Sequence, residues 1–310
     1  MRSAKRDAMR SQSKMLRIFV VILIFGVNAL CGKSVDAADK IEVVTTFSIL
    51  GDLTRAVGGD RVAVTTIVAP NGDAHTFHPT PADARRLGSA KVLVINGLGL
   101  EGWIARLREA SGFRGIVITA SKGVKPLEMM EHSKTLTDPH AWQNLQNGKL
   151  YVANIRDGLI AADPEGKAAF TANAANLATE IDKLDAEVRD SIGKLPPERR
   201  KIITTHDAFG YFGAAYGFEF IAPEGISTES EPSAKDLARI IRQIKAEKIP
   251  AVFLENVTDP RLLKQIAGET GAVIGGTLFS DSLSDPDGPA PTYLDMFRSN
   301  VRTLTTALSK

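Results

Sequence analysis

The sequence predicts an α/β fold with two lobes of parallel sheet and flanking helices, joined by one long backbone helix. Short β-branched, apolar segments alternate with helical segments in both halves of the chain, which is typical of buried parallel strands. One amphipathic stretch in the middle is much longer than the helices that connect such strands. The roughly 270 residues that follow the N-terminal leader can build one large domain or two moderate ones of roughly 100 to 150 residues each, and the alternation favours two.

Residues 1–37 are predicted to be a signal peptide that is removed from the mature protein. A basic leader precedes an apolar run at 18–30, and small residues before Ala38 offer a cleavage site. The run holds about 13 residues, whereas a membrane-spanning helix needs roughly 20. Cys31 provides an alternative as the attachment point of a lipoprotein, but Leu30 precedes it where lipoprotein processing normally needs a small residue. We therefore expect a periplasmic protein that begins near Ala38, and a lipoprotein as the less favoured alternative.

The leader also changes the charge of the protein. Residues 1–37 carry seven of the 38 Lys and Arg but only two of the 36 Asp and Glu, so the remainder has a net charge of −3. That balance argues against nucleic acid as a partner. Cys31 is the only cysteine, so the mature chain has no disulfide and no thiolate ligand. Any metal site must then use imidazole and carboxylate groups.

Residues 38–162 are predicted to form the N-terminal lobe, with strands at 41–46, 62–68, 92–95 and 116–119 and helices at 81–87 and 102–110. Residues 195–310 repeat the alternation and form the predicted C-terminal lobe, with strands at 201–205, 218–221, 251–254 and 272–275 and helices at 233–247 and 259–270. Two α/β lobes follow from this pattern.

Residues 163–194 are predicted to form the backbone helix between the lobes. Asp163 can cap this helix, Pro164 can occupy its first turn, and Gly193 ends it ahead of two prolines. Its apolar positions recur in steps of three and four and so share one face: Phe170, Ala174, Leu177, Ile181, Leu184, Val188 and Ile192. At about 1.5 Å per residue, its roughly 29 residues span about 43 Å, enough to run the height of both lobes.

Four side chains stand where parallel sheets bind ligands, at or near the carboxyl ends of strands. His75 lies in the loop after a strand, and His206 follows a strand directly. Asp281 follows a strand in the same way, with capping of a helix as its alternative role. His140 lies in a turn ahead of a helical segment. Each half of the chain therefore contributes two candidate ligands.

Three imidazoles and one carboxylate suit Zn²⁺, with expected bonds of about 2.0 to 2.2 Å. One aspartate leaves the loaded site at a net charge of about +1, which costs less to bury than a bare dication. Two other histidines fit less well. Pro79 follows His78 and disfavours the helical geometry that would direct it toward His75. His132 lies in the segment 128–133, a predicted polar loop that can bind metal only transiently.

A glycine motif offers a rival interpretation. Residues 97–102 fit G-x-G-x-x-G, follow a predicted strand and open a helix, as in a dinucleotide-binding fold. That fold needs an acidic residue at the end of the next strand to bind a ribose. The next strand ends in Ala120 and Ser121, which disfavours the dinucleotide interpretation.

Six motifs in order resemble the cluster A-I (TroA/ZnuA-like) metal-binding proteins of ABC transporters, zinc type, over essentially the whole mature chain: TTFSILGDL at 45–53, HTFHPTPAD at 75–83, NGLGLEGW at 96–103, DPHAW at 138–142, THDAF at 205–209 and SEPS at 230–233. The resemblance implies two α/β lobes on a backbone helix, a metal held between them, little hinge motion and no enzymatic activity. It also implies that the ligands fall on His75, His140, His206 and Asp281.

The same resemblance implies a monomer that delivers Zn²⁺ to an ABC permease in the inner membrane, with a periplasmic metallochaperone as a further candidate partner. In manganese-importing relatives the third ligand position is typically Glu. His206 occupies it here, which shifts the expected preference from Mn²⁺ toward Zn²⁺. The chain departs from many zinc members in lacking their long histidine-rich loop.

Two other classes of function stay open from the sequence. A secreted zinc hydrolase also uses three histidines and a water, but it needs an open coordination position and a base, for which Glu231 and Glu255 are the candidates. Asp281 as a fourth ligand closes the site against that chemistry. A surface adhesin, a role that some relatives are assigned, would be favoured by a lipidated Cys31.

Overall fold

The computed structural model describes residues 40–309 except 132, 133 and 230–232. The predicted signal peptide and Cys31 lie outside the described residues. No helix in the described ranges is both long and apolar enough to cross a membrane.

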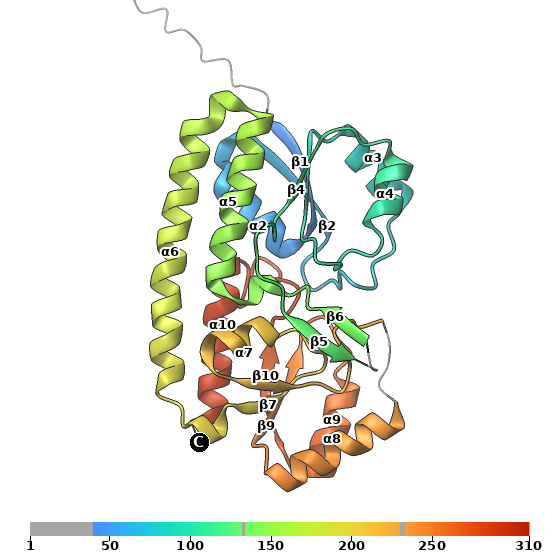
Figure 1. Ribbon diagram of the computed structural model, residues 1–310, viewed down its shortest axis with the longest axis vertical. Helices are drawn as coiled ribbons and strands as arrows, with labels where there is room; N and C mark the ends of the chain where they lie inside the picture. The colour runs from blue at the N-terminus through green and yellow to red at the C-terminus, as the bar shows by residue number, and fades with distance from the viewer. Residues whose placement is uncertain (1–39, 132–133, 230–232, 310) are drawn as a thin grey trace, which may run out of the picture. The chain divides into compact units, whose positions relative to one another are not determined.

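The N-terminal lobe, in the upper part of Figure 1, is built on a four-stranded parallel sheet. The order of its strands is β2-β1-β3-β4. Its strands are β1 (Ile41–Phe47), β2 (Val62–Val68), β3 (Val92–Ile95) and β4 (Ile116–Thr119). Its helices are α2 (Ser48–Gly58), α3 (Pro81–Ser89), α4 (Ile104–Ser111) and α5 (Leu145–Ala162). The sequence alone located these strands, because strands buried in a parallel sheet appear as short, nearly continuous runs of β-branched apolar residues.

The C-terminal lobe repeats this plan with a four-stranded parallel sheet ordered β10-β9-β7-β8. Its strands are β7 (Lys201–Ile203), β8 (Glu219–Ile221), β9 (Ala251–Glu255) and β10 (Val273–Leu278). Its helices are α7 (Gly210–Tyr216), α8 (Ala234–Glu247), α9 (Arg261–Thr270) and α10 (Tyr293–Leu308). β10 precedes Asp281 as predicted, and β7 precedes His206 but ends at Ile203, two residues before its predicted end.

The long helix α6 (Lys167–Gly193) runs along both lobes at the left of Figure 1. It packs against α2 and α5 at one end and against α10 at the other. Of the predicted apolar positions, Leu177 is half-buried and the others are buried. The predicted start is wrong in detail: a short 3-10 turn (Pro164–Gly166) precedes α6, and Asp163 makes no capping bond. Its carboxylate instead accepts a hydrogen bond from Arg61 at 2.7 Å.

One continuous hydrophobic core extends through both lobes. It joins Val43 and Phe47 of the first sheet to Phe253 of the second sheet and Phe297 of α10. A separate, smaller core fills the space between the second sheet and helices α8 and α9. The shared core makes the lobes a single packed body, because relative motion would expose apolar surface.

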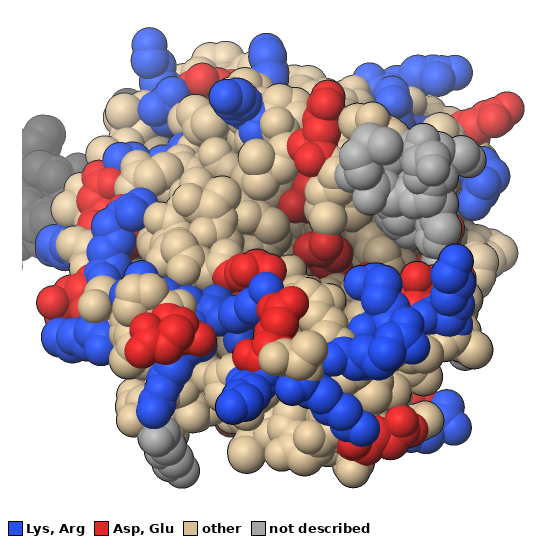
Figure 2. Space-filling view, turned by 60° about the horizontal axis from the view of Figure 1, so that its bottom comes forward, with Lys and Arg blue, Asp and Glu red and all other residues tan. Residues whose placement is uncertain are grey.

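In its described part, residues 128–131, the segment 128–133 is not the loop that the sequence suggested. It contributes β5 (Glu128–Glu131), which pairs antiparallel with β6 (Lys134–Thr137) in a two-stranded ribbon. His132 lies outside the described residues. Short 3-10 turns also occur at Gly59–Arg61, Ala141–Gln143 and Pro197–Arg199. On the face shown in Figure 2, acidic and basic side chains are interspersed, in keeping with the nearly balanced net charge.

Candidate metal centre

The four residues selected from the sequence meet between the lobes. One ligand atom from each of His75, His140, His206 and Asp281 lies within 4.8 Å of the others. Asp281 Oδ2 is 3.2 Å from Nε2 of His75, 3.6 Å from Nε2 of His140 and 3.2 Å from Nε2 of His206. All four are buried. Three imidazole nitrogens and one carboxylate oxygen therefore converge on one point.

His75 is carried by the loop between β2 and α3. Its backbone N–H donates to Asp73 Oδ1 at 2.8 Å, and the other oxygen of Asp73 accepts from Thr228 of the C-terminal lobe at 2.6 Å. Trp103 donates to the carbonyl of Ala74 at 2.8 Å, which fixes the residue before the ligand. His75 is 7% exposed, whereas the other three ligand candidates are fully buried. It therefore forms the solvent side of the site.

Asp138 orients His140. One oxygen of this carboxylate, Oδ1, lies 2.8 Å from His140 Nδ1 and also accepts the His140 backbone N–H at 2.9 Å. Two residues just after His140 then reach across to the other lobe. Trp142 Nε1 and Gln143 Nε2 donate to the carbonyl of Ser280, next to Asp281, at 2.9 and 2.6 Å. This turn therefore positions ligand candidates from both lobes.

Glu255, at the end of β9, holds the turn that carries His206. Its Oε1 accepts the backbone N–H groups of Thr205 and His206 at 2.7 and 2.9 Å. Its Oε2 lies 2.7 Å from His206 Nδ1. A carboxylate on the far nitrogen is the usual companion of a metal-ligating histidine, because it fixes the ring and increases its basicity. His140 and His206 both have this companion.

Asp281 follows β10 with only one oxygen directed to the three histidines. Its Oδ1 is buried and has no hydrogen-bond partner among the described residues. The alternative of helix capping is wrong, since the next helix, α10, begins at Tyr293 and is capped by Thr292. A buried carboxylate oxygen without a donor is costly unless a cation lies against it. This site therefore fits a bound metal ion.

Charge links the candidate ligands. Burial by itself would lower the pKa of His140, but Asp281 and Asp138 raise it to about 9. The pKa of His206 is likewise opposed by burial, yet Glu255 and Asp281 raise it well above its ordinary value. Burial opposes ionisation of Asp281, but His140 and His206 hold its pKa well below the usual range. The site thus favours an ionised carboxylate and excess positive charge, as protons or as a metal ion.

The remaining candidates do not join the cluster. His78 is exposed and is not among the converging groups. Glu231 lies outside the described residues. Glu255, the other proposed hydrolytic base, is engaged with the His206 turn and so is not directed at a water on the metal. Of the two proposed bases, the one that the structure describes therefore does not support a hydrolytic site.

The glycine motif at 97–102 serves the backbone rather than a nucleotide. Gly97 and Gly99 have positive φ values of 85° and 87°, which permit the tight turn. The carboxylate of Glu101 accepts the N–H groups of Asn96 and Gly97 at 2.6 and 3.3 Å. A phosphate would need such free N–H groups, so Glu101 occupies the place of the expected anion.

Sequence reasoning missed Asp138 as a partner of His140, and it treated Glu255 only as a rival base. A signal existed for Asp138, since the spacing Asp-x-His inside the motif at 138–142 lets the carboxylate reach both the backbone and the ring of the histidine. None existed for Glu255, which is far from His206 in the sequence.

Comparisons with known proteins agree with this fold. The family model described as "Zinc-uptake complex component A periplasmic" matches residues 43–307. The iron-binding protein YfeA of Yersinia pestis is 35% identical over 271 residues, which cover 87% of this chain and 86% of YfeA. The manganese-binding lipoprotein MntA of Halalkalibacterium halodurans is 32% identical over 94% of this chain and 98% of MntA.

Among solved structures, the periplasmic zinc-binding protein TroA from Treponema pallidum superposes with a TM-score of 0.83 at 32% identity, over 87% of this chain and all of that one. The names of these three proteins give iron, manganese and zinc. They therefore support binding of a transition metal as a class rather than zinc in particular.

Proposed function

The chain belongs to the family of periplasmic zinc-uptake complex component A, and from this premise we propose that it captures one Zn²⁺ ion between its lobes and delivers it to an ABC permease in the inner membrane. It is the metal-binding component of an ABC metal importer rather than an enzyme. The proposal includes lobes at 38–162 and 195–310 on either side of a backbone helix at 163–194, acting as a monomer. ATP hydrolysis would then be the task of other subunits, and a periplasmic metallochaperone is a further candidate partner.

One observation supports the proposal above all. His75, His140, His206 and Asp281, far apart in the sequence, bring ligand atoms within 4.8 Å of one another in a buried position. Mutually repelling imidazolium groups would not be gathered there without an anion or a metal to offset them. We propose these four as the metal ligands.

The donor set favours Zn²⁺ over Mn²⁺. Three imidazoles are softer donors than the oxygen ligands that Mn²⁺ prefers, and the general order of stability places zinc complexes above manganese complexes. Mn²⁺ is the second candidate, for two reasons. A relative at 32% identity is named manganese-binding, and the unpartnered Oδ1 of Asp281 offers a second oxygen for the larger coordination number of manganese.

Elemental analysis of the protein purified from its native cell envelope tests the proposal. We expect one equivalent of zinc per chain. One equivalent of manganese would instead support Mn²⁺, the second candidate, as the metal that the protein carries. A protein that carries no metal, and that neither Zn²⁺ nor Mn²⁺ titrates in calorimetry, would refute metal capture.

We also propose that the protein is exported and faces the outside of the inner membrane. The related MntA is named a lipoprotein, which favours a lipid on Cys31 more strongly than the sequence did, even though Leu30 precedes it. Both Cys31 and the cleavage site near Ala38 lie outside the described residues. The mass of the native protein distinguishes the two, because a chain that begins at Cys31 carries acyl groups and a chain that begins near Ala38 does not.

A further inference from the structure

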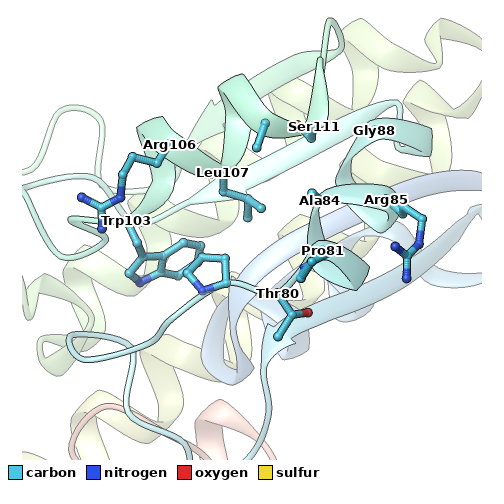
Figure 3. Close-up of a pocket in the computed structure, with 11 residues that line it drawn as sticks. Thr80, Pro81, Ala84, Arg85, Gly88, Trp103, Arg106, Leu107 and Ser111 are labelled. Carbon is cyan, nitrogen blue, oxygen red and sulfur yellow. The ribbon is translucent and has the colours of Figure 1, made fainter.

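A groove between α3 and α4 lies on the surface of the N-terminal lobe (Figure 3). Its volume is about 580 Å³. Most of its lining is apolar or small, with Trp103 and Leu107 buried beneath it and Pro81, Ala84 and Ala110 along its sides. An apolar groove of this size on an exposed surface fits a segment of another molecule better than it fits water.

Two arginines flank the groove, Arg85 on α3 and Arg106 on α4. Both are exposed, and neither has an ion pair or hydrogen bond among the described residues. Arg86 and Arg108 on the same helices differ: Arg86 pairs with Asp83, and Arg108 does not line the groove. Two unpaired guanidinium groups beside an apolar surface select for carboxylates and against cations.

The groove lies next to a second hollow, which His75 of the metal centre helps to line. This second hollow of about 450 Å³ is lined by His75, the least buried ligand candidate, together with Phe77, His78 and Glu229. Trp103 and Arg106 line both hollows. A molecule seated in the groove would therefore lie beside the opening through which a metal ion reaches His75.

We propose that this groove docks an extended, acidic segment of the membrane permease, with apolar side chains against Trp103 and Leu107 and carboxylates on Arg85 and Arg106. The inference rests on the proposed function. The position beside His75 places the partner where it can take over the metal ion. The recessed apolar surface fits a peptide segment better than lipid headgroups, which bind to flat, exposed rows of basic residues.

Uptake of radioactive zinc tests this docking surface. The assay uses cells that lack the gene for this chain and are complemented with variants of the full-length protein. The double variant Arg85→Glu and Arg106→Glu should lower uptake at least about tenfold, because reversed charges repel an acidic partner. The matched control, Arg108→Glu with Arg242→Glu on α8, makes the same change in net charge away from the groove. It should change uptake less than about twofold.

Two further variants separate docking from folding and from metal binding. Arg85 lines the groove but not the hollow at His75. The single variant Arg85→Glu should therefore bind zinc in calorimetry as tightly as the wild type, while its uptake of zinc falls. Ala110→Trp fills the groove without a change of charge and should also reduce uptake. Attachment of a photocrosslinker at Ala110 should yield a crosslink to an acidic peptide of the permease, identified by mass spectrometry.

Wild-type uptake by the groove variants would overturn the docking surface, and so would equal losses in the groove variant and its control. A crosslink that depends on anionic lipid rather than on the permease would mean that the groove binds the membrane surface. That result would overturn the proposal that it docks a permease segment. Failure of the proposed function gives a different result, since the wild-type protein itself would then neither bind zinc nor restore uptake.

Discussion

The two lobes close equivalent turns with the same device, a buried glutamate that accepts two consecutive backbone N–H groups after a strand. In the N-terminal lobe, Glu101 accepts from Asn96 and Gly97, just after β3. In the C-terminal lobe, Glu255 accepts from Thr205 and His206, just after β7. Both carboxylates satisfy N–H groups that would otherwise be buried without partners.

The difference lies in what the rest of each carboxylate does. Glu255 directs its second oxygen at the ring of His206, 2.7 Å away, and so acts directly on a ligand candidate. Glu101 binds the hydroxyl of Thr46 instead, and it reaches the site only through Asn96, whose side chain donates to the carbonyl of Pro139, the neighbour of His140. One turn was therefore adapted to hold a ligand, and the other only to hold the fold.

Removal of the ligand itself should give the largest effect. His206→Ala takes away one of three nitrogen donors and leaves Glu255 buried without its partner, so we expect zinc affinity to fall by orders of magnitude in calorimetry. His78→Ala is the control, since His78 is exposed and outside the cluster. Unchanged affinity of the His206 variant would remove the C-terminal turn from the metal site.

Replacement of the two glutamates comes next and tests the comparison directly. Glu255→Gln retains the shape but removes the charge opposite His206, and we expect zinc affinity to fall about 10- to 100-fold, as it does for other carboxylates behind metal ligands. Glu101→Gln should leave affinity within about twofold of the wild type, because it has no contact with a ligand. Equal losses in both variants would show that the two turns act alike.

The free energy of unfolding should reveal what Glu101 contributes to the fold. Glu101→Gln places an amide nitrogen against a backbone N–H, so we expect the free energy of unfolding in urea to fall by about 1 to 3 kcal/mol. The loss should be the same with and without zinc, since affinity is unchanged. Zinc at a thousandfold excess over its dissociation constant should stabilise both this variant and the wild type by about 4 kcal/mol. A smaller zinc effect in the Glu101 variant would connect its turn to the metal.

Much of this architecture could be predicted because neighbouring residues in the sequence determine it. The strands of the first sheet were found to within a residue, since each is a short apolar run bounded by turns. The start of α6 was not, because Asp163 had an unseen partner, Arg61, more distant in the sequence. The ribbon of β5 and β6 was missed for a related reason: polar strands at a surface lack the apolar alternation that marks a strand.

The four ligand candidates were predictable for a different reason. Parallel sheets gather ligands at the carboxyl ends of their strands, so position and residue type were enough for His75, His206 and Asp281. The groups that orient them were not predictable in the same way. Glu255 ends an apolar strand, β9, and only the pairing of β7 with β9 brings its carboxylate to His206.

The release of protons on zinc binding should show the smallest effect, and it tests the comparison of Glu101 with Glu255 most closely. The pKa of His140 is raised to about 9, and that of His206 is also raised, and both shifts favour the protonated rings in the metal-free protein. For His140, whose unfolded pKa is about 6.5, the associated stability is fully present below that value and is lost as the pH rises through about 9. Zinc must displace these protons, so its affinity should increase from pH 6 to pH 9.

Calorimetry in buffers of different ionisation enthalpy counts the protons that zinc releases. We expect net release of protons at pH 7 for the wild type, because zinc displaces protons that the raised pKa values of His140 and His206 favour. Glu255→Gln removes a charge that raises the pKa of His206, so this variant should release fewer protons, whereas Glu101→Gln should release as many as the wild type. An equal count in all three proteins would mean that Glu255 positions the turn without acting on the ring, and the two lobes would then use their glutamates in the same way.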